Sequence, residues 1–330
     1  MDKHYIGHPL QTTGVEEYRM IGGKADGMRF YSVRNGLGLE FTVSADRAAD
    51  ITRLTFQGAN MSYISPCGYT APTYYDKDGT GFLKSFTSGF ITTCGLNNIG
   101  IPCEDEGESF GLHGTISHLP AEHIYYTETD DEITISAEIR DAEIFRQKLI
   151  LKRQYKVSKT SNHIEVLDSV ENEGSRPEPL MMMYHMNMGY PLLDEHSFLS
   201  VSSNEVEPRD ERAAEGIGSW HQMLPPTANF EEQCYYHHFN DAKACAKLYS
   251  PTIRKGLAVT FYTDTLNIMT QWKMMGQRDY VLGMEPCNHK LYGRRALREN
   301  NDLKYINPGE TISFRMEIDF FDNQTLWENK

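Results

Sequence analysis

Positive charge is scarce in this chain. Its 330 residues include 32 lysines and arginines against 46 aspartates and glutamates, which gives a formal net charge of −14. Proteins that bind nucleic acids or anionic membranes need clustered positive charge. The charge balance therefore argues against both classes of partner, and it is compatible with a neutral ligand such as a sugar.

Long apolar runs and paired cysteines are missing as well. No window approaches the roughly 20 apolar residues of a membrane-spanning helix, and residues 1–5 lack the apolar segment of a secretory signal. The six cysteines are scattered and none forms a C-x-x-C pair, so the sequence indicates neither a zinc site nor a required disulfide. We therefore expect a cytoplasmic protein without a bound metal or a membrane anchor.

Helical periodicity is the third absence. No apolar pattern with a helical period continues for more than about three turns, the usual helix length. Alternation with a period of two residues dominates instead, which is the pattern of half-buried strands. It is clearest in residues 133–139, 149–157, 164–170 and 312–320, and shorter stretches occur at 39–43, 257–261 and 267–272.

Many short antiparallel strands joined by hairpin turns, without alternating helices, are typical of a β-sandwich. No repeat, linker or low-complexity stretch divides the chain. We therefore expect one domain that spans residues 1–330. Residues 66–86 and 208–230 show no clear period and are expected to be long loops, which in compact domains are often functional.

The most informative polar residues follow the apolar run 180–183. His185 and Asn187 are two residues apart, so on an extended backbone their side chains share a face. A neutral imidazole and a carboxamide offer both donors and acceptors, which suits a polyhydroxylated ligand better than a metal or a phosphate. The alternative is that His185 is a buried core histidine, which its apolar lead-in equally allows.

Two further residues complete a candidate acid–base site. His113 stands in Gly111-Leu112-His113-Gly114, where the backbone can approach a ligand closely, although a histidine satisfied by turn carbonyls is the alternative. Glu285 ends the strand-like run 280–284 and is either desolvated and functional or placed at the rim. Two histidines and a carboxylate on separate segments are what general acid–base catalysis needs.

Three other residues are candidates for ligand contacts. Trp272 offers a flat face for a sugar ring, but a core position is the favoured alternative. Arg47, close to Asp50 in the chain, could hold a hydroxylated ligand with two hydrogen bonds, or form a structural ion pair with Asp50. Asn288 extends the expected rim beside Glu285.

Taken together, these segments resemble the aldose 1-epimerase (galactose mutarotase) superfamily, in a divergent branch. The resemblance rests on Gly-Leu-His113-Gly114, on residues 168–174 leading into Tyr-His185-Met-Asn187, and on Gly-Met-Glu285-Pro286. It implies an all-β fold, a large antiparallel β-supersandwich with the sugar on its concave sheet. It also implies that Glu285 is the general base, that His185 is the general acid and that His113 binds the sugar near its ring oxygen.

The activity implied by the resemblance is an isomerase that interconverts the α and β anomers of a sugar through ring opening, without a cofactor. The expected partner is a small sugar, and the expected state a monomer or homodimer. A run Thr115-Ile116-Ser117 stands where familiar members carry an arginine, so plain galactose or glucose is not the expected substrate. Arg47 and Trp272 are expected to recognise a different sugar.

Two other function classes remain open. A non-catalytic carbohydrate-binding protein would have little need of a costly desolvated carboxylate such as Glu285. A lyase of saccharide acids would favour a basic groove, for which the net charge of −14 gives no sign. A glycosidase needs two carboxylates across the bond that it cleaves, whereas only one of the three central positions is a carboxylate.

Overall fold

The computed structural model describes residues 3–330. In this part of the chain, antiparallel pairing joins the strands into three large sheets and three two-stranded ones. The largest sheet has eight strands. Its order in space is β11 (His123–Glu128), β12 (Glu132–Ala142), β13 (Lys148–Ser158), β14 (His163–Asn172), β25 (Thr311–Phe321), β21 (Lys255–Tyr262), β20 (Lys243–Ser250) and β17 (Phe198–Val201).

The other two large sheets lie next to each other. The six-stranded sheet has the order β18 (Glu205–Pro208), β19 (Gln233–His238), β22 (Ile268–Met275), β23 (Tyr280–Cys287), β16 (Met181–Met188) and β8 (Ile91–Leu96). The five-stranded sheet runs in sequence order through β1 (Gly14–Arg19), β2 (Arg29–Arg34), β3 (Leu39–Ser44), β4 (Asp50–Phe56) and β5 (Ala59–Asn60).

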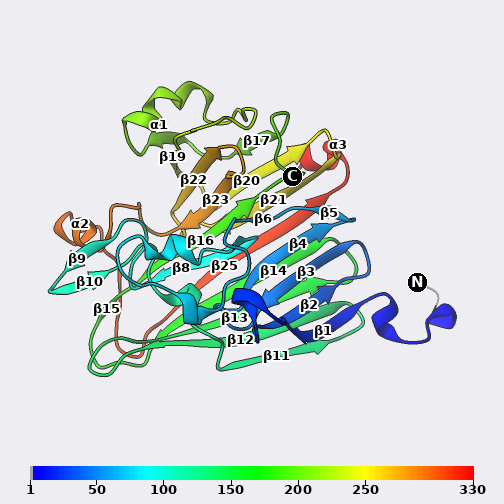
Figure 1. Cartoon of the computed structure of the whole chain (residues 1–330), viewed down its shortest axis with the longest axis horizontal. Helices are drawn as coiled ribbons and strands as arrows, with labels where there is room; N and C mark the ends of the chain where they lie inside the picture. The colour runs from blue at the N-terminus through cyan, green and yellow to red at the C-terminus, as the bar shows by residue number, and fades with distance from the viewer. Residues whose placement is uncertain (1–2) are drawn as a thin grey trace.

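Backbone contacts join β4 to the start of β8. The Phe90 amide donates to the Thr52 carbonyl at 2.8 Å, and the Thr93 amide donates to the Asp50 carboxylate at 2.9 Å. The five-stranded and six-stranded sheets therefore form one layer. This layer packs against the eight-stranded sheet through pairs such as Phe56 and Phe320 (Figure 1).

The remaining elements are short. The two-stranded sheets are β6 (Tyr63–Ile64) with β7 (Ser88–Gly89), β9 (Cys103–Asp105) with β10 (Glu108–Phe110), and β15 (Glu178–Pro179) with β24 (Tyr305–Ile306). The α-helices are α1 (Glu211–Glu215), α2 (Arg294–Glu299) and α3 (Gln324–Glu328). The 3₁₀-helices are η1 (Lys3–Tyr5), η2 (Pro9–Gln11), η3 (Gly23–Ala25), η4 (Pro72–Tyr74), η5 (Gly81–Lys84), η6 (Ile116–His118) and η7 (Ile217–Ser219). None of the helices in residues 3–330 is long and apolar enough to cross a membrane.

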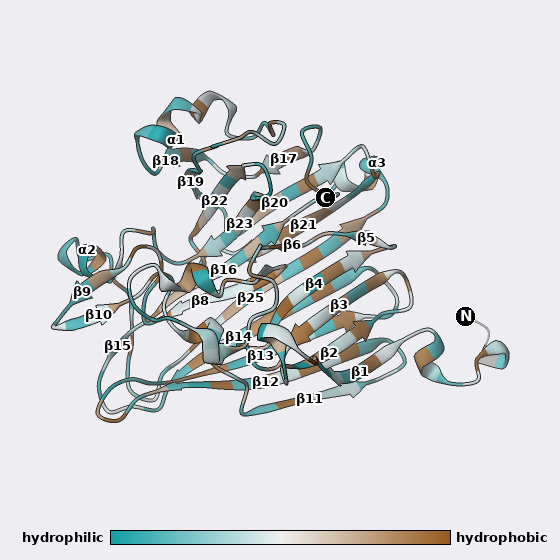
Figure 2. Ribbon diagram, viewed as in Figure 1, coloured by the Kyte–Doolittle hydropathy of each residue, from teal (hydrophilic) through white to brown (hydrophobic). Residues whose placement is uncertain are grey.

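The predicted all-β, antiparallel sandwich is confirmed. Figure 2 shows hydrophobic and hydrophilic residues alternating along the long strands of both layers, as expected where one face of a sheet is buried and the other meets water. The register aligns the apolar sets across neighbouring strands, as in Ile135, Tyr155, Val166 and Met316. The predicted loops 66–86 and 208–230 hold only short elements, among them η4, η5, α1 and η7.

A buried ionic network joins the two layers. The guanidinium of Arg153 on β13 contacts the carboxylates of Asp168 on β14 at 2.6 Å and Asp50 on β4 at 2.7 Å. It also donates to the Thr93 hydroxyl at 2.7 Å, and the Tyr184 hydroxyl donates to Asp168 at 2.8 Å. Burial alone would disfavour the Arg153 cation, but the two carboxylates outweigh it and raise its pKa well above the ordinary value.

Removing one charge of this network should destabilise the fold strongly. Asp168→Asn keeps the shape of the side chain but leaves the Arg153 charge undercompensated in the interior, so we expect a loss of about 3–5 kcal/mol in the free energy of unfolding. The matched control is Glu171→Gln, which breaks an ion pair with Lys152 on the surface of the same strand pair and should cost about 0–1 kcal/mol. Urea denaturation of both variants measures the difference, and equal losses would contradict a central role for the network.

Candidate active site

His185 and Glu285 lie side by side on the outer face of the six-stranded sheet. The register of β16 with β23 pairs Met186 with Met284 and Met183 with Cys287, which brings His185 opposite Glu285. Tyr184 and Met186, the neighbours of His185, point to the interior, so His185 points outward. The Nδ1 atom of His185 lies 3.1 Å from Oε1 of Glu285. The two side chains therefore converge from one face of the sheet and are in direct contact.

These two residues form the floor of a pocket of about 400 Å³, a size in the range of small-molecule sites. His113 joins them from the segment between β10 and η6, and its ring centre lies 5.5 Å from that of His185. The pocket is lined by Phe82, Leu83, Phe86, Gly100, Ile101, Leu112, His113, His185, Arg209, Glu232, Cys234, Trp272, Glu285 and Leu291.

The electrostatics of the floor favour uncharged groups. Burial raises the pKa of Glu285 well above its ordinary value; the Glu232 carboxylate adds to this and Arg209 opposes it. Burial also lowers the pKa of His185 well below its ordinary value; His113 lowers it further, whereas Asn187 opposes the shift. Although Nδ1 and Oε1 are close, their alignment does not make a hydrogen bond, and neither atom has another protein partner. Both atoms are therefore left available for hydrogen bonds with a ligand.

His113 is held as a hydrogen-bond donor. Its backbone has a φ of 59°, and its Nδ1 atom accepts a hydrogen bond from the Gly100 amide at 3.3 Å. Burial lowers the pKa of His113 to about 4, so the ring is neutral at pH 7. Because Nδ1 is an acceptor, we assign the single ring hydrogen to Nε2. A neutral donor of this kind can polarise a sugar oxygen without adding charge.

Trp272, Arg209 and Glu232 form one wall of the pocket. The indole Nε1 of Trp272 donates to Glu232 at 2.7 Å, and Arg209 donates to the other oxygen of Glu232 at 3.1 Å. Trp272 is half-buried at the pocket and not part of the core interior. Our sequence reasoning missed Arg209 and Glu232. They flank the loop 208–230, and the aperiodicity of that loop was the signal that could have located them.

Arg47 is not brought into the pocket. Its guanidinium donates to the backbone carbonyls of Ser117, Thr70 and Ser85 at 2.7–3.1 Å and contacts His118 at 2.9 Å. It is buried, and burial lowers its pKa to about 10. The expected ion pair with Asp50 is also wrong, because the Asp50 carboxylate binds Arg153 instead. Arg47 therefore joins three loop segments and is not part of the pocket lining.

The two predicted asparagines form hydrogen bonds to the backbone around the site and do not line the pocket. The Asn187 amide donates to the carbonyls of Gly89 and His185 at 3.2 and 2.8 Å. Asn288 accepts from the Met182 amide at 2.8 Å and donates to the Leu180 carbonyl at 2.9 Å. Both side chains are buried and absent from the pocket lining. They fix β16, which carries His185, against its neighbouring segments.

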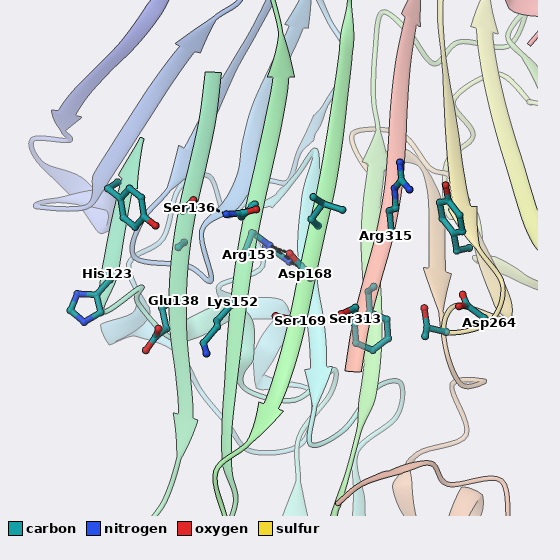
Figure 3. A pocket seen from close by; sticks show the side chains of 17 residues that line it. His123, Ser136, Glu138, Lys152, Arg153, Asp168, Ser169, Asp264, Ser313 and Arg315 are labelled. Atoms are coloured by element: carbon teal, nitrogen blue, oxygen red, sulfur yellow. Dashed lines mark hydrogen bonds and ion pairs between the residues drawn. The ribbon is translucent and has the colours of Figure 1, made fainter. Parts of the chain in front are cut away.

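A larger hollow of about 840 Å³ lies on the outer face of the eight-stranded sheet (Figure 3). None of the predicted site residues lines it. Its exposed charges have surface partners, as in Lys152 with Glu171 at 2.8 Å and Arg315 with Glu165 at 2.7 Å. Arg153 and Asp168, drawn in the same view, pair with each other in the interior. Size alone would select this hollow, but the buried acid–base pair is in the smaller pocket, and we take that pocket as the candidate site.

The fold is that of galactose mutarotase-like proteins. The family model described as "Domain of unknown function (DUF4432)" matches residues 25–320, so the chain belongs to this family. No match was found among curated proteins.

Solved structures with the same fold come from several bacteria. A Klebsiella pneumoniae protein provisionally named an aldose 1-epimerase superposes with a TM-score of 0.88 at 21% identity, over 97% of this chain and 90% of that one. A galactose mutarotase-like protein from Clostridium acetobutylicum gives 0.66 at 13% identity, over 94% and 99%. Galactose 1-epimerase from Lactobacillus acidophilus gives 0.65 at 13%, over 95% and 100%. At these identities the likeness establishes the fold alone.

The buried carboxyl group should make stability depend on pH. The pKa of Glu285 is raised in the folded state. The contribution of its protonated form to the stability of the fold is therefore complete at pH values below the pKa of the unfolded state. It is lost as pH rises through the pKa of the folded state. Glu285→Gln cannot ionise, so we expect the melting temperature of this variant to exceed that of the parent increasingly as pH rises. Thermal melts between pH 5 and 9 measure this, with Glu40→Gln, an exposed position on β3, as the control. A difference in melting temperature between variant and parent that stays constant over this pH range would contradict a raised pKa for Glu285.

Proposed function

We propose that this protein is an isomerase of the aldose 1-epimerase type, which acts as a single domain of residues 1–330 and interconverts the α and β anomers of an aldose. The observation that carries the proposal is the buried contact of 3.1 Å between His185 and Glu285 on the floor of a small pocket. The fold shared with proteins named as aldose 1-epimerases supports it.

The short contact suits the chemistry of an anomeric carbon. The two oxygens that exchange protons, the anomeric hydroxyl and the ring oxygen, are bonded to the same carbon. An acid and a base that contact each other can therefore each reach one of them from the same side. Glu285 removes the proton of the anomeric hydroxyl, and His185 supplies a proton to the ring oxygen. The bond between C1 and the ring oxygen breaks and leaves the open-chain aldehyde.

Rotation about the C1–C2 bond then presents the other face of the aldehyde. Ring closure reverses the two proton transfers, so that His185 takes back its proton and Glu285 returns one to the new anomeric hydroxyl. The pair ends with the same single proton with which it began. No net redox change or co-reactant is involved, and a protein cofactor has no step to supply.

The electrostatics explain how the pair holds that proton. Burial favours the neutral forms of both groups, so the resting pair is a protonated Glu285 beside a neutral His185. The ion pair that starts the reaction has the same net charge and differs from the resting pair only in the position of one proton. Sugar hydroxyls that donate to the carboxylate stabilise this form.

The other pocket residues bind the sugar. The Nε2–H of His113 donates to the sugar beside the ring oxygen, and the face of Trp272 packs against the C–H face of the ring. Arg209 and Glu232 offer donors and acceptors to hydroxyl groups. Arg47, Asn187 and Asn288 are not part of the pocket lining, so we assign them no binding role.

A glycosidase is the second candidate, and one observation favours it. Glu232 adds a second carboxylate to the lining of the pocket that contains Glu285, and glycosidases use two. However, Glu232 already accepts from Trp272 and Arg209, whereas Glu285 faces His185. Release of free sugar from aryl glycosides, without faster anomer exchange, would select the glycosidase.

Glu285→Gln should abolish catalysis while the site remains formed. Glutamine keeps the shape and hydrogen bonding of the side chain but cannot accept a proton at neutral pH. We expect the rate of anomer exchange, followed by NMR exchange spectroscopy on the anomeric protons, to fall at least about 100-fold, the usual contribution of a positioned base. Glu40→Gln should behave as the parent. A Glu285→Gln protein that exchanges anomers at the parental rate would show that Glu285 is not the base.

The pH dependence should report a pair that carries one proton. Burial lowers the pKa of His185 and raises that of Glu285, so the one-proton state spans neutral pH. We expect kcat/KM to be constant around neutral pH. In acid, below the ordinary histidine pKa of about 6.5, it should fall because the pair gains a second proton. In alkali it should fall because the pair loses its only proton. An optimum confined to a narrow interval near pH 6.5 would instead indicate an unshifted histidine.

A further inference from the structure

The two sides of the candidate pocket differ in chemistry. One side is the Arg209–Glu232–Trp272 wall, with charged groups that remain partly exposed. The opposite side, which we call the apolar wall, consists of Phe82, Leu83, Phe86, Ile101 and Leu112. No side chain of the apolar wall carries a hydrogen-bonding group. A fully hydroxylated sugar would therefore meet suitable partners on one side only.

The backbone of the apolar wall does not make up for this. The amide groups of three of its residues already donate to carbonyls within the protein. The amide of Leu83 bonds to the carbonyl of Thr80 at 3.0 Å, that of Ile101 to Leu291 at 3.4 Å, and that of Leu112 to Gly79 at 2.9 Å. A sugar hydroxyl directed at this wall would find no donors from these amides. A methyl group there would instead gain apolar contact.

The reacting groups fix which edge of the sugar faces the apolar wall. The ring of His113 packs against this wall, with its centre 5.3 Å from that of Phe82. The ring of His185 lies between the two walls, 5.1 Å from Phe86 and 5.4 Å from Trp272, so His113 marks the apolar side. These are the residues that serve the ring oxygen in the proposed function. In a pyranose the ring oxygen is bonded to C1 and C5, so the substituent on C5 lies on the side of the histidines.

The opposite edge of the sugar then faces the polar wall. Glu285 lies on β23 beside β22, the strand that carries Trp272, and Trp272 holds Glu232 through its indole nitrogen. The C2 side of the sugar, beside the anomeric hydroxyl that Glu285 deprotonates, is therefore directed at Glu232 and Arg209. These groups supply an acceptor and a donor for the hydroxyls of that edge.

We propose that the substrate is an aldopyranose with a methyl group in place of the hydroxymethyl group on C5, that is, a 6-deoxyhexose, whose methyl group lies against Leu83, Ile101 and Leu112. This inference rests on the proposed function, since it uses the positions of the acid and the base to orient the ring. It makes the apolar wall the determinant of specificity.

The test compares sugars that differ only at C6. NMR exchange spectroscopy is run on D-fucose with D-galactose, D-quinovose with D-glucose, L-fucose with L-galactose and L-rhamnose with L-mannose. In the pair that the protein turns over fastest, we expect kcat/KM for the deoxy sugar to be about tenfold to 100-fold higher, the usual range for one hydroxyl in an apolar pocket. A parent hexose that matches or exceeds its deoxy partner in that pair overturns the inference.

Variants of the apolar wall provide the second measurement. Leu83 and Ile101 are 55% and 54% exposed, so Leu83→Asn and Ile101→Thr should fold normally. Each should reduce the preference for the deoxy sugar at least about threefold by offering a partner to the extra hydroxyl. The control is Ile144→Thr, at a position 77% exposed in the β12–β13 turn and outside the pocket, which should leave the preference unchanged. An unchanged preference in both wall variants also counts against the inference.

The two proposals fail in different ways. If no sugar of the panel exchanges its anomers faster with the protein than without it, the proposed isomerase function fails, and the inference fails with it. If anomer exchange is accelerated but favours the hydroxymethyl sugars, the isomerase function stands and only the deoxy-sugar specificity is wrong.

Discussion

The buried charge of Arg153 is the constraint on which the rest of the structure depends. A guanidinium in the interior is tolerated only if carboxylates and hydroxyls surround it, and these come from four strands besides its own: Asp50 on β4, Thr93 on β8, Asp168 on β14 and Tyr184 on β16. The network therefore fixes how the two layers of the sandwich face each other. Since Tyr184 must point inward to reach it, the next residue, His185, must point outward.

The site depends equally on what covers the outer face. The segment that contains η5 places Phe82 and Phe86 against the two histidines, and Arg47 ties this segment to those around Thr70 and Ser117. This cover removes water from His185 and Glu285 and shifts their pKa values in opposite directions. Arg47 thus contributes to the chemistry as a clamp on the loops, although it does not contact the pocket.

The pocket itself joins elements that are far apart in the chain. Its apolar wall comes from residues 82–112 and its floor from β16 and β23, whereas its polar wall comes from both ends of the loop after β18 and from Trp272 on β22. One pocket can therefore combine an apolar side with a charged side. That asymmetry orients a ring whose two edges differ in polarity, and it arises because different segments supply the two sides.

The sequence by itself determined the alternating strands, because alternation of apolar and polar residues is a property of neighbours along the chain, as in residues 133–139 of β12. Strands buried on both faces, such as β16, carry no alternation and were not located by it. It also indicated His113, His185 and Glu285, since each stands in a distinctive local setting. Only the tertiary structure decided that His185 contacts Glu285 at 3.1 Å, that Arg47 binds backbone carbonyls, and that Arg209 and Glu232 belong to the pocket. Strand register and the paths of the loops set these contacts, and no local pattern encodes either of them.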